Sequence, residues 1–310
     1  MHYGNLGWAL LLGLASAGCA LEVQDAGESA PEDVLNVSAT LLGGWATGPF
    51  VWSQDLPARM LEPVSSHVCV LTRMSGKFSG SGESVRVEHD GSRWFLRGSS
   101  RQVGVSGEAT CFPRARFVPP SGRPSGGGYR TIVSEEAALH YTAYRSCQSA
   151  EREIPVNGDG FVFLSGMRGL MEGGGEWARV VQSPSVNTPS FLQGQLCVDV
   201  IDNQRIQARG FRVTSTSGLA TFMNAAGVRG DLNAIGEFSV TGNDSEVMAP
   251  ASRAMCAFTY ITGQFEGGGE AIQIRSELIN GVERWVLRSK RGGASDYIAA
   301  KARCYAASQL

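Results

Sequence analysis

The chain has 310 residues, of which 43% are hydrophobic and 18% charged, so it can bury a core and is long enough for two or three domains. Its 27 basic and 29 acidic residues leave a net charge of −2, with no basic patch that suggests nucleic-acid binding and no acidic block that suggests a solvating tail. The 40 glycines cluster at turns and form no low-complexity tract.

The N-terminal residues have the pattern of an export signal. Residues 6–15, LGWALLLGLA, form an apolar run that is too short for a bilayer, which takes about 20 residues, and a small-residue processing site follows them. We therefore interpret residues 1–18 as a signal peptide. The segment Ser16-Ala17-Gly18-Cys19 resembles the bacterial lipoprotein signal, which implies that Cys19 is diacylated and becomes the new N-terminus. Ordinary cleavage after Ala17 is the alternative.

Lipidation of Cys19 would tether the protein to a membrane without spanning it, since two or more acyl chains make a stable anchor. Residues 19–33 are polar, acidic and rich in small side chains, which predicts a flexible tether. Ala20 lacks the aspartate that retains some lipoproteins at the inner membrane, so the analogy implies the outer membrane. A secreted or periplasmic protein is the alternative.

Three similar segments follow along the chain. They start at residues 69, 162 and 256, in steps of 93 and 94, which is the mark of tandem duplication. Glycines recur at 76, 169 and 263 and at two further positions, a glutamate follows in each copy, and leucines recur at Leu96, Leu192 and Leu287. We predict module 1 over 34–118, a Pro/Gly/Ser-rich linker over 119–129, a divergent module 2 over 130–212, and module 3 over 213–310.

The positions of the cysteines follow the repeats. Modules 1 and 3 carry a pair at matching places, which predicts the disulfides Cys69–Cys111 and Cys256–Cys304. Module 2 has Val162 and Gly210 at those places, so both members are lost together, as bonded partners would be. Cys147 and Cys197 most simply bond each other, although other connectivities remain possible. Three disulfides imply an oxidising compartment, and the spacing does not suggest zinc.

Each module has the pattern of a β-hairpin. In module 1, Val85 and Val87 alternate with polar residues, Asp90-Gly91 supplies a two-residue turn, and Trp94 and Leu96 alternate again. Folding about that turn places Val87 opposite Trp94 and Val85 opposite Leu96, all on one face. The strands that carry the cysteines would flank the hairpin, and both repeated tryptophans, Trp94 and Trp285, would lie in the core.

Modules 2 and 3 vary the hairpin. In module 3, Asn280-Gly281 is the turn and sets Ile274 opposite Leu287. In module 2 a longer loop, residues 183–190, replaces the tight turn, and its two prolines are expected to stay out of the sheet. Helical periodicity is weak throughout, with Ser134–Ala143 the best candidate. The expected fold is all-β, with three tandem antiparallel, sandwich-like modules.

The recurring glutamates Glu83, Glu176 and Glu270 are the first candidate ligand-binding residues. A carboxylate on a Gly-flanked loop could bind sugar hydroxyls or calcium. The structural interpretation, which we favour, is that the glycines allow positive φ while the glutamate accepts hydrogen bonds from nearby backbone N–H groups.

Arginines form the second candidate. Arg97 and Arg288, with Gln193 in module 2, are expected on the hairpin face opposite the valines, beside Arg86 and Phe95. Such a strip could bind a polysaccharide or another anionic polymer through stacking and bidentate hydrogen bonds. The solvated face of an antiparallel sheet is the more common meaning of this pattern.

Catalytic patterns are sparse. There is no GxSxG elbow, no HExxH and no P-loop, and none of the histidines recurs in the repeat. An extracellular hydrolase that uses Glu176 with Asp159 on polysaccharide or cell wall is the alternative function. We expect no metal and no cofactor.

The Cys-x-Leu-Thr opening, the G-x-F-x-G-x-G-E turn, the RWFLRG strand and the A-T-C-F close resemble a small disulfide-bonded β module of exported bacterial proteins, some of which are similar to adhesin or pilus-tip segments. The resemblance implies surface binding. The sequence thus predicts a non-catalytic, lipid-anchored protein of the cell envelope whose repeated modules bind a glycan, an envelope component or a protein.

Overall fold

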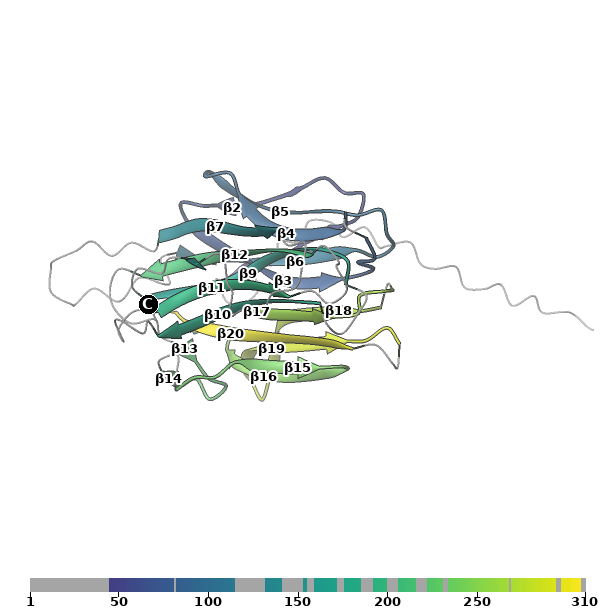
Figure 1. The fold of residues 1–310 in the computed structure, drawn as a ribbon. Helices are drawn as coiled ribbons and strands as arrows, with labels where there is room; N and C mark the ends of the chain where they lie inside the picture. The colour runs from purple at the N-terminus through teal and green to yellow at the C-terminus, as the bar shows by residue number, and fades with distance from the viewer. Residues whose placement is uncertain are drawn as a thin grey trace, which may run out of the picture. The chain divides into compact units, whose positions relative to one another are not determined.

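The computed structural model describes residues 45–80, 82–114, 132–140, 153–154, 159–171, 176–184, 192–199, 206–215, 222–230, 234–267, 269–293 and 297–307 (Figure 1). These residues form antiparallel β-sheets and contain no helix, which confirms the predicted fold class. All of them belong to the unit Ser38–Leu310. The signal peptide, the tether, the linker 119–129 and Cys147 lie outside the described residues.

The strands form three sheets. Sheet 1 contains, in order, β1 (Thr47–Ser53), β6 (Ser106–Pro113), β3 (His67–Ser75), β18 (Ala271–Ile279), β19 (Val282–Lys290) and β16 (Asp244–Pro250). Sheet 2 contains β2 (Arg59–Pro63), β5 (Arg93–Ser99), β4 (Ser84–His89), β9 (Asp159–Gly169), β12 (Ile206–Ser215) and β7 (Ile132–His140). Sheet 3 contains β14 (Arg229–Gly230), β13 (Phe222–Met223), β20 (Ile298–Ala306), β17 (Ala254–Gly263), β10 (Trp177–Pro184), β11 (Leu192–Asp199) and β8 (Glu153–Ile154), and β15 (Phe238–Thr241) also pairs with β20.

Every sheet is shared between two modules according to the same rule. In each module we call the strand at the first cysteine position the opening strand (β3, β9, β17) and the strand at the second the closing strand (β6, β12, β20). These two strands pair with each other, but the hairpin between them in sequence crosses to another sheet. There its first strand pairs with the opening strand of a different module: β4 with β9, β10 with β17, and β18 with β3. Figure 1 shows β4 beside β9. The exchange closes into a cycle, so the three repeats are interlocked and related by a pseudo-threefold arrangement.

A ring of backbone hydrogen bonds joins the three modules where each opening strand has ended. Phe78 N donates to Phe265 O (2.6 Å), Phe265 N to Met171 O (2.8 Å), and Met171 N to Phe78 O (2.8 Å). The three residues occupy the same place in the repeat, two positions after the recurring glycine, and all are fully buried. Because each partner comes from a different module, the ring requires all three.

The hairpin of module 3 has the predicted register. Ile274 pairs with Leu287 and Ile279 with Val282. Asn280 and Gly281, at φ 51° and 76°, form the turn, as expected of a two-residue loop in which both residues have positive φ.

The hairpin of module 1 buries the predicted face, but the predicted strand register was wrong by two residues. Val87 pairs with Leu96 and Val85 with Gly98, whereas Trp94 pairs with His89. The reason lies in the turn, where Asp90 N donates to Arg93 O (3.2 Å), so the turn is centred one residue later than Asp90-Gly91. An even shift returns every side chain to the same face, which is why the apolar pattern did not reveal it.

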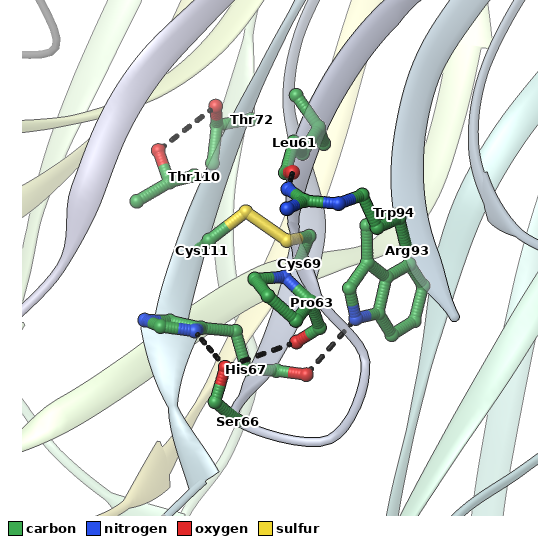
Figure 2. Close-up of a disulfide and its surroundings, with 10 residues drawn as sticks. All are labelled: Leu61, Pro63, Ser66, His67, Cys69, Thr72, Arg93, Trp94, Thr110 and Cys111. Carbon is green, nitrogen blue, oxygen red and sulfur yellow. Dashed lines mark hydrogen bonds between the residues drawn. A yellow bond between two sulfur atoms is a disulfide. The ribbon is translucent and has the colours of Figure 1, made fainter. Parts of the chain in front are cut away.

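The disulfides Cys69–Cys111 and Cys256–Cys304 are confirmed, and each joins directly opposed residues of an opening and a closing strand. Figure 2 shows how the hairpin is attached beside the first of them: Trp94 Nε1 donates to His67 O (2.9 Å). Trp285 Nε1 makes the equivalent bond to Ala254 O (2.8 Å). Both tryptophans are buried, as predicted, and their N–H groups tie each hairpin to the opening strand of its own module.

Module 2 departs from the predictions at several positions. Residues 132–140, which overlap the segment Ser134–Ala143 considered for a helix, form the strand β7, because its pairing with β12 outweighs local propensity. Val162 pairs with Arg212, so Arg212 and not Gly210 stands opposite it at the position of the missing cysteine bridge. The segment from Val162 to Arg212 is two residues longer than the segment of 48 between Cys256 and Cys304, so counting along the repeat stops at Gly210, two residues short.

The hairpin of module 2 is also displaced by its longer loop. Val180 pairs with Leu196, as Val87 pairs with Leu96, so Leu196 and not Leu192 is the equivalent leucine. Cys197 therefore occupies the place that the sequence comparison assigned to Gln193. Pro184 is the last residue of β10 and pairs with Leu192, so it lies in the sheet and not outside it.

Candidate functional site

The three recurring glutamates lie at the centre of the fold. Glu83, Glu176 and Glu270 are buried, with 4%, 2% and 3% of their surface exposed. Glu270 Oε2 accepts a hydrogen bond from Gly267 N at 2.9 Å, within its own glycine-rich turn. This contact is the one that the structural interpretation requires of Glu270, whereas Glu83 Oε2 is buried and has no hydrogen-bond partner. Their role in ligand binding stays a prediction.

Their backbone carbonyls also connect modules. Glu270 O accepts from Gly76 N (3.1 Å), Glu83 O accepts from Gly169 N (2.9 Å), and Glu176 O accepts from Thr262 Oγ1 (2.6 Å). In each case the donor belongs to another module, at the end of its opening strand. The glutamates therefore sit where the hairpin crosses from one sheet to the next.

The arginine strip of module 1 lies on the outer face of sheet 2, as predicted. Glu88 accepts ion pairs from Arg86 (2.7 Å), Arg97 (2.8 Å) and, from module 2, Arg209 (2.6 Å). Burial opposes ionisation of Glu88, but hydrogen bonds from Arg209 and Arg86 and the charge of Arg97 outweigh it and lower its pKa. Arg97 also lies over the ring of Phe95, at 5.1 Å from the centroid. The three guanidinium groups here are already engaged by one carboxylate.

Arg288 lies in a different setting on the outer face of sheet 1. Its Nε and a terminal nitrogen donate to the two carboxylate oxygens of Glu277 (2.7 and 2.8 Å), and Arg275 Nε donates to the same carboxylate (2.6 Å). These hydrogen bonds, first those from Arg288, lower the pKa of Glu277 to about 2. Arg288 and Arg275 also line a groove.

This groove, which we call the sheet 1 groove, has a volume of about 710 Å³. It is lined by Arg73, Asn243, Asp244, Ser245, Ala271, Gln273, Arg275, Arg288, Ser289, Lys290 and Arg291. Five of these side chains are cationic and one is a carboxylate, and the lining also includes the small side chains of Ala271 and Ser245. Glu108 and Glu277 pair with three of these cations, and with Asp244 they leave five positive charges against three negative ones, so the groove keeps a net positive charge.

A second cavity of about 280 Å³ adjoins the groove and shares Gln273 and Arg275 with it. Pro49, Thr110 and Trp285 line its other side. Glu108 lines the second cavity and accepts hydrogen bonds from Arg73 (3.0 Å) and Gln273 (3.0 Å), which both line the groove. Together the groove and the cavity offer cationic, hydroxyl and apolar contacts within one surface.

The proposed acid pair of a hydrolase is not brought together. Asp159 begins β9, an eleven-residue strand that spans about 30 Å, and Glu176 lies beyond its other end, bonded to Thr262. Glycosidase carboxylates are about 5 to 9.5 Å apart. Within the described ranges, no group of three His, Cys, Asp or Glu residues could hold a metal ion, and no helix is long and apolar enough to cross a membrane.

Sequence reasoning found Arg288 but missed the rest of the groove. Arg73 comes from module 1 and the remaining lining residues from module 3, and they meet only because β18 pairs with β3. A signal was present in the alternation of Gln273, Arg275 and Glu277 along one face of β18. Comparisons of the chain with protein-family models, with curated proteins and with solved structures found no match.

Proposed function

We propose that the protein is a non-catalytic binding protein of the cell envelope that holds an anionic glycan or another anionic envelope component in the sheet 1 groove. The observation that carries the proposal is the lining of that groove, with five cationic side chains and one carboxylate. Arginine presents several donors in a planar fork that fits carboxylate and sulfate groups, and a cationic groove raises the local concentration of an anionic polymer.

The proposal includes export and anchoring through a diacylated Cys19, with the outer membrane as the expected site. The two disulfides support an oxidising compartment. A mass measurement on the protein isolated from its native membrane tests the anchor: the expected result is the mass of a chain that begins at an acylated Cys19, and an unmodified chain that begins earlier or later would contradict it.

Binding of polygalacturonate, compared with neutral dextran, tests the groove. We expect Lys290→Glu to weaken binding of the full chain to polygalacturonate about tenfold, because Lys290 is an exposed cation in the groove and its reversal repels the polymer. The affinity of the unaltered chain should also fall as salt is raised from about 0.05 to 0.5 M.

Arg101→Glu is the matched control, since it makes the same change of charge at an exposed turn residue that does not line the groove. Equal effects of the two substitutions would show that only net charge matters and would contradict a site. Binding of dextran as tight as that of polygalacturonate would also contradict the proposal.

A further inference from the structure

A second group of cations, distinct from the sheet 1 groove, lies on sheet 3. Arg179 on β10, Tyr260 on β17 and Lys301 on β20 are neighbours in register across three adjacent strands. Arg303, two residues further along β20, and Glu237, just before β15, complete what we call the sheet 3 cluster.

The cations of the sheet 3 cluster surround one carboxylate without bonding it closely. The nearest nitrogens of Arg179, Lys301 and Arg303 are 3.8, 3.9 and 4.0 Å from the oxygens of Glu237, beyond hydrogen-bond distance. The Nε atoms of Arg179 and Arg303 are buried and have no hydrogen-bond partner. A buried donor without an acceptor is costly, and an added anion would supply acceptors.

The pseudo-threefold arrangement provides an internal comparison. Arg86 has the same place in the module 1 hairpin that Arg179 has in module 2, since they pair with Gly166 and Tyr260 respectively. Around Arg86, three guanidinium groups hold Glu88 at 2.6 to 2.8 Å. The carboxylate on sheet 2 is therefore held at 2.6 to 2.8 Å, against 3.8 to 4.0 Å for Glu237 on sheet 3, although Arg97 Nε on sheet 2 is also buried without a hydrogen-bond partner.

Arg303 is largely buried, in addition to having an Nε atom without a hydrogen-bond acceptor. Its side chain is 13% exposed, and desolvation lowers its pKa despite the opposing charge of Glu237, with the positive charge of Arg179 acting in the same direction as burial. Three cations and one carboxylate leave the cluster with excess positive charge. Arg179 and Lys301, at 41% and 39% exposure, are open to solvent and could reach a ligand.

Aromatic rings adjoin these cations. The rings of Trp177 and Tyr260 are 6.1 Å apart and tilted by 40°, and Lys301 Nζ lies 5.7 Å from the centroid of Tyr260. Trp177 and Arg179 are two residues apart on β10 and so share a face of the sheet. The apolar face of a sugar ring could lie against this pair while an acidic substituent reaches the guanidinium groups.

We propose that the sheet 3 cluster is a binding site for an acidic sugar residue, a uronate or a sulfated hexose, whose anionic group is held by Arg179 and Arg303 and whose ring lies against Trp177 and Tyr260. This site goes beyond the sheet 1 groove and rests on contacts that the groove does not share. A nucleic acid also combines anions with stackable rings, but the disulfides favour an extracellular glycan as the ligand.

Titration of the full chain with tetragalacturonate, followed by tryptophan fluorescence, tests the site. Trp177 is partly exposed, so a sugar placed against it should change its emission, and Trp177→Phe should remove that change. Arg179→Gln should weaken binding at least tenfold. Glu237→Gln should strengthen binding severalfold, because it removes the competing carboxylate, and a loss of folding alone could not produce this gain.

Two controls separate this site from other surfaces. Arg86→Gln, at the equivalent place on sheet 2, and Lys290→Glu, in the sheet 1 groove, should leave the Trp177 signal and its midpoint unchanged. If Lys290→Glu has no effect on polygalacturonate while Arg179→Gln abolishes the Trp177 signal, the groove proposal fails and this one stands. An unchanged midpoint in Arg179→Gln, an equal response to maltotetraose, or tighter binding of an eight-residue oligothymidylate would overturn the assignment.

Discussion

Individual glycines determine where the chain can pass from one sheet to another. Gly76 has φ 101°, a conformation that L side chains rarely adopt, and a Cβ at this position would lie 2.2 Å from Gly104 O. Gly263, the equivalent residue of module 3, has φ 136°, and its Cβ would lie 2.5 Å from Tyr297 O. The recurrence of these glycines therefore reflects a geometric requirement.

We expect Gly76→Ala to lower the free energy of unfolding by at least about 2 kcal/mol, because it combines a disfavoured φ with a backbone clash two residues before Phe78, which belongs to the ring of backbone hydrogen bonds between modules. Urea denaturation followed by circular dichroism measures the effect. Gly82→Ala is the matched control, since a Cβ there would meet nothing within 4 Å, and we expect a change below about 1 kcal/mol. Equal losses from the two substitutions would contradict the account.

Asp90 gives the module 1 turn a pH dependence. Its carboxylate accepts from Arg93 N (2.9 Å), Ser92 Oγ (2.7 Å) and Ser92 N (2.8 Å), and these bonds lower its pKa from 3.8 to about 2. Because the pKa is lowered in the folded state, the stabilisation is complete above about pH 4 and disappears as the pH falls from there to 2.

Asp90→Ala should therefore destabilise the protein at pH 5 and lose most of that effect at pH 2. Urea midpoints of the variant and the unaltered chain at the two pH values, with the disulfides intact, provide the measurement. Ser92→Ala removes only the hydroxyl donor, so its effect should be smaller. A difference between Asp90→Ala and the unaltered chain that stays constant from pH 5 to pH 2 would be inconsistent with a role of the carboxylate.

At the level of elements, alternation predicted the hairpins and which face each side chain takes, but turn chemistry decided their register. Asn280 adopts positive φ, so the turn forms at Asn280-Gly281 and the predicted pairing is correct. Asp90 instead uses its side chain to accept from the residues that follow, and the turn moves by one position. The two dipeptides look interchangeable in a sequence, and their side-chain bonding distinguishes them.

The disulfide Cys69–Cys111 closes a chain segment with a sequence separation of 42. Loop-closure entropy for a segment of this length corresponds to about 4 kcal/mol. We expect the double substitution to alanine to lower the free energy of unfolding by about 2 to 4 kcal/mol, measured by urea denaturation, because the residues face each other across β3 and β6 and the bond needs no change of fold. An unchanged midpoint would contradict it.

For the whole molecule, the sequence predicted the threefold repeat but not the exchange of hairpins between modules. Local patterns report neighbours along the chain, so they predicted the cysteine pairs and the apolar hairpin faces. The pairing of β18 with β3 joins residues about 200 positions apart, and no local pattern specifies it. The groove and the sheet 3 cluster both depend on such pairings, which is why only Arg288 among their residues was singled out beforehand.

Because of the exchanged hairpins, a module that is continuous in sequence does not form a sheet of its own. The expected modules are tandem in sequence, but β3 and β4 of module 1 each pair with a strand of another module. The ring at Phe78, Met171 and Phe265 leaves buried backbone groups without partners when one module is missing. A module cut from the chain would expose these edges and lose much of its core.

Expression of residues 45–114 alone, with Cys69–Cys111 oxidised, tests the interlocked arrangement most directly. We expect the fragment to give the narrow amide dispersion of an unfolded chain in NMR, while the full chain unfolds in one cooperative transition. A dispersed spectrum from the isolated fragment, together with separate transitions in the full chain, would mean that the modules fold independently and would contradict the shared sheets on which both proposed binding surfaces depend.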